Sequence, residues 1–243
     1  MVDLPHIAPK QIYIATRPDG ASDESFAARW RQHGSFVRSL PLWRNINHYE
    51  QCLIQPDPAD VGDSIPDREP GYDMVGMVWF RSAEAVTEAL ADPTVEQVYA
   101  DERETFREPI AETSLMTREV VQRDLGGTRA KVVAFVKRKP DMTRAEFSDY
   151  WENTHGPLFL ATEEVSGAVV KYVQNHTLES NTGPLNEFDG VVEIGFRRPE
   201  EIGAAFGHPA YLERIRPDEE RFLDLERMIV VNTDEKLLYE DAL

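Results

Sequence analysis

Apolar and polar residues follow one another along the chain with two periods, one typical of strands and one typical of amphipathic helices. Phe26 and Trp30 begin an apolar stripe of helical period, which predicts a helix that starts at Ser22 or Asp23 and ends near Leu40. Runs rich in β-branched and aromatic residues predict strands. For the first half of the chain we expect, in order, a strand over 12–16, this helix, strands over 46–54 and 72–81, short helices from Ser82 and from Asp92-Pro93, and a strand over 112–122.

The second half of the chain repeats this pattern. We therefore expect two repeats, residues 1–125 and 126–243, each with the element order β-α-β-β-α-β of a ferredoxin-like unit. In the first part of each copy the spacing between matched residues drifts from 121 to 123, which indicates small insertions in the second copy. The second copy should form strands over 131–138, 168–177, 188–197 and 227–236, and helices over 143–163, 199–206 and 209–225. Matched pairs include Pro18 with Pro140, Phe26 with Phe147, Trp30 with Trp151, His33 with His155, Tyr49 with Tyr172, and Asp73 with Asp189.

A ferredoxin-like unit covers one face of its sheet with helices and leaves the other face bare. A bare apolar sheet needs a partner, and two copies in one chain can cover each other. We therefore expect an α+β fold in which two ferredoxin-like βαββαβ units form an intramolecular, pseudo-dimeric α+β barrel.

The composition excludes several classes of binding partner. The chain of 243 residues has 26 Lys and Arg against 44 Asp and Glu, a net charge of −18 that repels phosphate backbones, so no nucleic-acid partner is expected. No run approaches 18 apolar residues and the first ten residues do not resemble a secretory signal, so we expect a cytoplasmic protein with no membrane partner. The lone cysteine, Cys52, and the scattered histidines predict no metal site. Phosphate-binding loops, dinucleotide fingerprints and the GxSxG nucleophile motif are all absent from the sequence.

Three consecutive segments of the second half resemble the EthD-domain family. They are a strand that ends in Lys137-Arg138-Lys139-Pro140, a helix with Phe147, Tyr150-Trp151 and His155-Gly156-Pro157, and a strand that ends in Tyr172 and Gln174. The first half carries a shorter version of the helix motif, with Ser35 in place of the proline. The resemblance implies the dimeric α+β barrel fold and, by analogy, cofactor-free decarboxylases and dehydratases of aromatic or polyketide compounds. Accessory proteins, monooxygenases and haem-binding peroxidases also belong to the wider group, so the fold leaves the function open.

Three histidines are candidate catalytic residues. His33 and His155 lie on the apolar face of matched helices, where an imidazole could act as general acid or base in a cavity between helix and sheet. The alternative is a buried histidine that fixes the end of the helix, and its presence in both copies suits that interpretation. His208 stands where the first copy has Asp92, and histidine is the poorer helix cap, so it is a third candidate; the alternative is an exposed turn residue.

Aromatic and acidic residues near these histidines are candidate substrate ligands. Tyr49 and Tyr172 could hydrogen-bond a phenol or a carbonyl group, or could be half-buried strand tyrosines. Asp73 and Asp189, at matched strand starts, could orient a histidine or could be strand-edge carboxylates. The aromatic wall that would hold a planar ligand consists of Trp30, Trp151 and Phe159.

Together these features predict a cofactor-independent lyase, a decarboxylase or a dehydratase, acting on a small aromatic or polyketide-like compound by histidine acid–base catalysis. The alternatives are a non-catalytic small-molecule-binding accessory protein and a monooxygenase or haem-dependent oxidoreductase. No cofactor is expected, and pairing of two such chains into a homodimer stays open. Phe159 and His208 favour the cavity of the second half.

Overall fold

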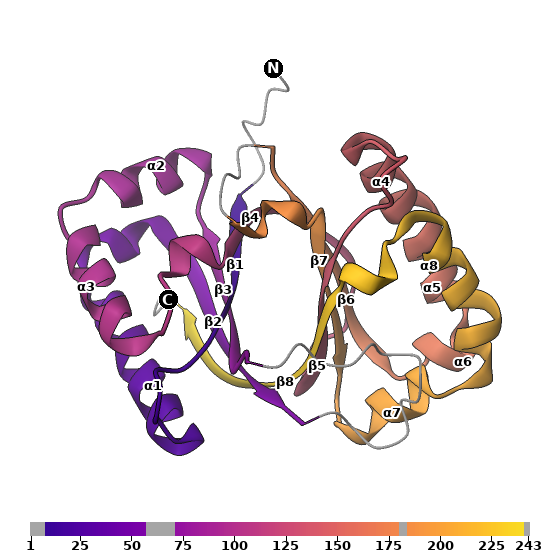
Figure 1. Ribbon diagram of the computed structural model, residues 1–243, viewed down its shortest axis with the longest axis horizontal. Helices are drawn as coiled ribbons and strands as arrows, with labels where there is room; N and C mark the ends of the chain where they lie inside the picture. Colours follow the sequence, from indigo (N-terminus) through magenta and orange to yellow (C-terminus); the bar gives the residue numbers. More distant parts are fainter. Residues whose placement is uncertain (1–7, 57–70, 180–183, 241–243) are drawn as a thin grey trace.

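Eight strands form one closed barrel, and the helices lie outside it in two groups (Figure 1). The computed structural model describes residues 8–56, 71–179 and 184–240. The first half supplies β1 (Pro9–Ala15), β2 (Ile46–Gln55), β3 (Met74–Phe80) and β4 (Ser114–Asp124). The second half supplies β5 (Ala130–Val136), β6 (Val169–Thr177), β7 (Gly190–Phe196) and β8 (Ile229–Glu240).

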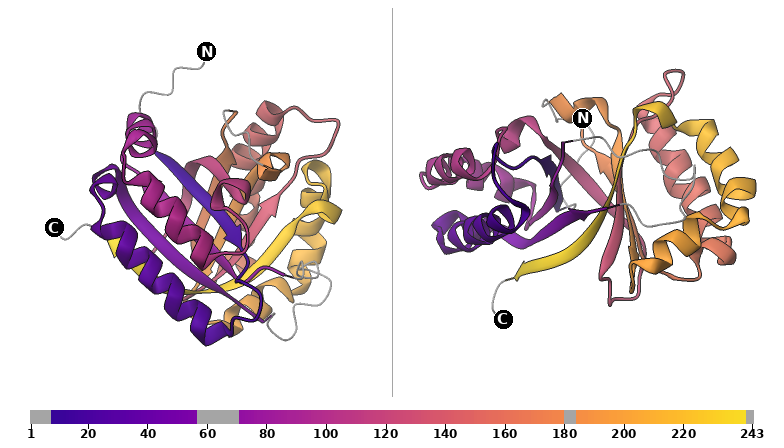
Figure 2. Two further views of the ribbon diagram at one scale, coloured as in Figure 1. Left: turned by 60° about the vertical axis from the view of Figure 1, so that its left-hand side comes forward. Right: turned by 60° about the horizontal axis from the view of Figure 1, so that its bottom comes forward.

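The order of the strands shows that the two halves share the barrel. Around it the strands run β1-β3-β2-β8-β5-β7-β6-β4, so each half contributes four neighbouring strands. The halves meet at two antiparallel seams, β2 with β8 and β4 with β6. The predicted pseudo-dimeric α+β barrel is therefore confirmed, and Figure 2 shows the two groups of helices on opposite sides of it.

The helices of the first half pack on the outer face of β1 to β4. They are α1 (Asp23–Ser39), α2 (Ala83–Ala91) and α3 (Val95–Thr105), with 3₁₀ turns η1 (Pro41–Asn45) and η3 (Ile110–Glu112). The Ser22 hydroxyl accepts the Ser25 N–H at 3.2 Å, as expected of a helix N-cap. Phe26, Trp30 and Val37 form the buried face of α1, so the apolar stripe was interpreted correctly.

The helices of the second half are more broken than the sequence predicts. The expected helix over 143–163 consists of α4 (Arg144–Tyr150), the π-helical turn η4 (Trp151–His155) and α5 (Gly156–Ala161). A second π turn, η6 (Tyr211–Ile215), precedes α8 (Arg216–Phe222). The remaining elements are α6 (Glu163–Ser166), α7 (Glu200–Phe206) and the 3₁₀ turns η5 (Pro184–Glu187) and η7 (Leu225–Arg227).

The π turn η4 explains why the helix motif is one residue longer in the second half. His155 follows Trp151 by four residues, whereas His33 follows Trp30 by three. A π turn absorbs one extra residue without breaking the helix. Both histidines therefore remain on the buried face.

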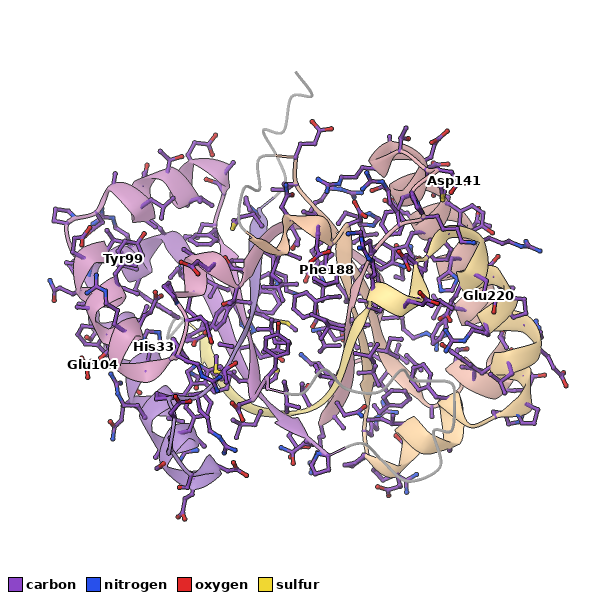
Figure 3. The ribbon with its side chains drawn as sticks, viewed as in Figure 1. His33, Tyr99, Glu104, Asp141, Phe188 and Glu220 are labelled. Carbon is purple, nitrogen blue, oxygen red and sulfur yellow. The ribbon has the colours of Figure 1, made fainter. Side chains whose placement is uncertain are left out.

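The interior of the barrel is filled by side chains and holds a buried ionic network. Phe188, near the middle of the molecule in Figure 3, packs edge-on against Phe135 with ring centroids 5.9 Å apart. Lys10 pairs with Glu193, and Lys131 pairs with Glu50, in both cases across the two halves. The sequence analysis did not foresee these buried charges. We therefore expect a small-molecule site on the outer faces of the strands, beneath the helices.

None of the helices in the described ranges is long and apolar enough to cross a membrane.

Candidate functional site

The first half contains the larger of two equivalent cavities beneath the helices. It measures about 380 Å³ and lies between the outer face of the first-half strands and the helices α1, α2 and α3. Small-molecule sites generally begin at about 300 Å³. Most of its wall is apolar, and its polar lining consists of Gln11, Tyr13, His33, Tyr49, Tyr99, Glu102 and Ser114. Figure 3 places His33 and Tyr99 among these helices.

His33 forms an imidazole–carboxylate pair in the wall of this cavity. Its Nδ1 lies 2.7 Å from Oδ2 of Asp101 on α3, and its ring is 4% exposed. Arg29 donates to the other oxygen of Asp101 at 2.7 Å. Partial burial disfavours the charge on Asp101, but hydrogen bonds from Arg29 and His33 hold the pKa of this carboxyl below its ordinary value. An ionised Asp101 requires the proton on Nδ1.

Nε2 of His33 is consequently the basic nitrogen. Among the described residues no side chain or backbone group hydrogen-bonds to it, and His33 lines the cavity. Burial lowers the pKa of His33 from its ordinary 6.5, although Asp101 opposes the shift. At neutral pH the ring is therefore mostly uncharged, the form that can accept a proton from a ligand.

Two tyrosines meet at the floor of the cavity. The hydroxyl oxygens of Tyr13 and Tyr49 lie 2.6 Å apart. The Tyr49 oxygen also accepts from Nε1 of Trp30 at 2.9 Å and from Nε2 of Gln51 at 3.1 Å. Either hydroxyl can be the donor of the hydrogen bond between Tyr13 and Tyr49. Tyr13 lines the cavity, and burial next to Tyr49 keeps its hydroxyl protonated by raising its pKa well above the usual value.

Glu102 adds a second titratable group to the wall. It follows Asp101 directly on α3, is half-buried and lines the cavity. Burial, and then the adjacent charge of Asp101, raise the pKa of Glu102 to about 7. No hydrogen bond reaches its carboxyl group from the described residues. The cavity thus pairs a basic imidazole with a carboxyl group that can hold a proton near neutral pH.

The second half has the same pair but almost no free space. Nδ1 of His155 lies 2.9 Å from Oδ2 of Asp218 on α8, and Tyr150 donates to Oδ1 of Asp218 at 2.6 Å. The cavity beside His155 measures only about 50 Å³. Phe159, stacked on Tyr172 with centroids 4.8 Å apart, occupies part of the space.

In the second half the carboxyl group that corresponds to that of Glu102 is bound by neighbouring side chains. Glu219, the residue after Asp218, accepts from the Tyr211 hydroxyl at 2.8 Å and pairs with Arg216 at 2.8 Å. By the sequence repeat, Val37 and Val95 stand in the first half where Phe159 and Tyr211 stand in the second. Two small side chains in place of two aromatic rings account for the larger cavity.

The remaining predicted histidine and the two tryptophans lie in different positions relative to the cavities. The His208 ring accepts the Ala210 N–H at 3.2 Å, a turn role like that of Asp92, which accepts the Thr94 N–H. His208 does not line either cavity. Trp30 is buried behind Tyr49, whereas Trp151 lines the second cavity.

Asp73 and Asp189 do not contact the histidines. Asp73 accepts the backbone N–H of Arg17 at 2.8 Å, and Asp189 binds Arg138 and Arg144. The carboxylates that orient the histidines are Asp101 and Asp218, which the sequence analysis missed. A signal was available, because both copies carry the pair Asp-Glu in their last helix, at 101–102 and 218–219.

Comparison with known proteins relates the chain to one domain family and one fold. The EthD domain family matches residues 18–109 and again 139–226. Over 102 residues the chain is 31% identical to a protein of Metarhizium robertsii named conidial pigment biosynthesis dehydratase EthD, a match that covers 37% of this chain and 70% of that protein.

Solved structures of similar fold are more distant in sequence. An anthrone oxidase-like protein superposes with a TM-score of 0.68 at 8% identity, over 97% of this chain and 94% of the other. A mutant chlorite dismutase from Candidatus Nitrospira defluvii gives 0.55 at 11% identity, over 94% and 92%. At these identities the likeness shows the fold alone.

Proposed function

Because this chain belongs to the EthD-domain family and is a small-molecule-processing enzyme of the α+β barrel superfamily, we propose that it is a cofactor-independent lyase whose active site is the first-half cavity. Its substrate is a small aromatic or polyketide-like compound, from which it removes water or carbon dioxide. The observation that carries the proposal is the free Nε2 of His33, held by Asp101 in the wall of a cavity of about 380 Å³.

Each polar group of the cavity has a role in such a reaction. His33 takes a proton from carbon next to a carbonyl group, and Asp101 stabilises the imidazolium ion that forms. The hydroxyl of Tyr13 donates a hydrogen bond to the carbonyl oxygen, where negative charge develops. The apolar wall holds the rings and excludes water.

The proposal moves the active site from the half that the sequence favoured. Phe159, one reason for that expectation, fills the second cavity instead of forming the wall of an open one. His208, a second reason beside the shorter loop of the second half, caps a turn. In the second half His155 and Asp218 join the turn η4 to the helix α8, whereas the structural alternative considered from the sequence was a histidine that fixes the end of its own helix.

Replacement of His33 tests the proposal. Two probes give the same fluorescent product, 1-naphthol: 3-hydroxy-1-tetralone by loss of water and 1-hydroxy-2-naphthoate by loss of carbon dioxide. With the probe that wild type turns over, we expect His33→Ala to lower turnover by about 10²–10⁴-fold. The matched control is His155→Ala, which should keep turnover within a few-fold of wild type. Circular dichroism checks that both variants are folded. Equal turnover in wild type and His33→Ala would contradict the proposal.

A further inference from the structure

We infer that the first-half cavity selects uncharged, hydroxylated ring compounds against carboxylates, and that Glu102 both enforces this selection and donates the proton to a leaving hydroxide. The reaction it serves is therefore loss of water. The inference rests on the proposed function, which leaves loss of water and loss of carbon dioxide open.

The lining of the cavity is unfavourable to an anion. Its described lining contains no lysine and no arginine, while Glu102 carries a carboxyl group. Behind the wall, Asp101 is a second carboxylate. A substrate carboxylate that leaves water for such a site needs a cation or several donors, and at a pH above about 7 it would meet the charge of Glu102 instead.

Arg29, the arginine that binds Asp101 behind the wall, is already engaged. Arg29 donates from Nη2 to Oδ1 of Asp101 at 2.7 Å and to its backbone oxygen at 3.2 Å, and from Nη1 to Oδ2 at 3.3 Å. Turning Arg29 towards a ligand would break this fork and release the Asp101 that orients His33. The second cavity does contain a cation, Arg216, but Glu219 neutralises it at 2.8 Å.

The cavity is equipped for neutral oxygen atoms. The Tyr13 hydroxyl faces it from the sheet, and Tyr99 lines it from α3. Phenolic hydroxyls and side-chain amides recognise ketone and hydroxyl groups, while the apolar majority of the wall suits fused rings. A hydroxylated cyclic ketone satisfies both kinds of surface.

Glu102 completes the chemistry that a neutral substrate requires. His33 Nε2 removes a C–H proton next to the carbonyl, and the electron pair of that bond forms the new carbon–carbon double bond. The C–O bond breaks at the neighbouring carbon, and hydroxide departs as water with the proton of Glu102. One substrate thus gives one unsaturated product and one water. The proton on His33 returns to Glu102 through solvent, so no redox partner is needed.

Equilibrium binding of a matched ligand pair tests the inference without turnover. The probes are 1-naphthol, which is uncharged at pH 8, and 1-naphthoate, which has the same rings and a carboxylate; titration calorimetry gives both dissociation constants. We expect wild type to bind 1-naphthol about 10- to 100-fold more tightly, the effect of one nearby charge in a partly buried site. Glu102→Gln should bring the ratio to within a few-fold.

The control is Glu104→Gln on the exposed side of α3, labelled at the outer edge of Figure 3, which should keep the wild-type ratio. A ratio near one in wild type, or weak binding of both ligands, overturns the inference, as does a ratio that Glu102→Gln leaves unchanged. His33→Ala should lose turnover but keep the ratio. A failure of the proposed function therefore shows in turnover, and a failure of this inference shows in binding.

Discussion

At the scale of single residues, two copies of the same histidine–carboxylate pair border cavities of different size. Both imidazole rings pack against a matched phenylalanine, His33 against Phe106 at 5.4 Å and His155 against Phe222 at 4.9 Å between ring centroids. His33 lines a cavity of about 380 Å³, whereas His155 lines one of about 50 Å³. The residue after each aspartate differs in the same way, since Glu102 accepts no hydrogen bond from the described residues and Glu219 is bound by Tyr211 and Arg216. The pair itself is common to both copies, and the residues around it differ between them.

The two titratable groups of the first cavity predict a bell-shaped pH profile for dehydration. His33 must be neutral to accept a proton, so turnover rises with pH through its pKa, which burial places below 6.5. Glu102 must be protonated to donate, so turnover falls as pH rises through about 7. Steady-state rates of 3-hydroxy-1-tetralone dehydration between about pH 5 and 9 check this profile.

A variant of Glu102 tests the assignment of the alkaline limb of that profile. In Glu102→Gln the alkaline limb should disappear and the plateau should lie about 10²-fold or more below wild-type turnover. Glu104→Gln should keep both limbs. An alkaline limb that persists near pH 7 in Glu102→Gln would assign that ionisation to another group.

The histidines could be found from the sequence because they repeat at matched helix positions, but their partners could not be chosen. Each half offers several aspartates, and Asp73 and Asp189 are as well matched as Asp101 and Asp218. Which carboxylate reaches the ring depends on how α3 and α8 pack beside the first helix of each half. The size of a cavity depends on the combined volume of many side chains, so Val37 and Val95 did not by themselves predict the larger cavity.

At the scale of secondary-structure elements, the larger residue of one cross-strand pair lies on different strands in the two halves. Tyr13 on β1 lies opposite Gly76 on β3, and the equivalent pair in the second half is Ala134 opposite Val192. A Cβ atom on Gly76 would overlap the Tyr13 ring. Strand periodicity predicted both sheets, but it does not show that a glycine in one strand makes room for a tyrosine in the next.

This exchange predicts non-additive effects on stability. Gly76→Val should lower the free energy of unfolding by about 1–3 kcal/mol, because the Tyr13 ring is forced out of its place. The double variant with Tyr13→Ala copies the second half and should recover most of that loss. Urea denaturation followed by circular dichroism measures all three variants. Costs that simply add in the double variant would show that the two positions do not compete for space.

At the scale of the whole molecule, the two halves are joined by charges inside the barrel as well as by the strand seams. Burial would raise the pKa of Glu193, but Lys10, Lys171 and Lys131 hold it well below the usual range. Lys10 and Glu193 belong to different halves, as do Lys131 and Glu50. Hydrophobic patterning predicted that the bare sheets close on each other, but it could not reveal these pairs, since a lysine in a strand is ordinarily assigned to the solvent face.

Replacing one member of such an ion pair should lower the free energy of unfolding more than replacing both members. Lys131→Met removes the lysine that pairs with the buried Glu50, and Glu50→Leu removes one carboxylate from the buried Lys131, which keeps Glu193 at 3.3 Å. Each variant should lose about 3–5 kcal/mol of unfolding free energy, because it breaks a buried ion pair from one side. The double variant leaves no unpaired charge, because Glu193 keeps Lys10 and Lys171, and should lose less than either single variant. Guanidinium denaturation measures the three losses, and the shared barrel should unfold in one transition in each case. A double variant that loses as much as the two single variants together would show that the charges do not act as a pair.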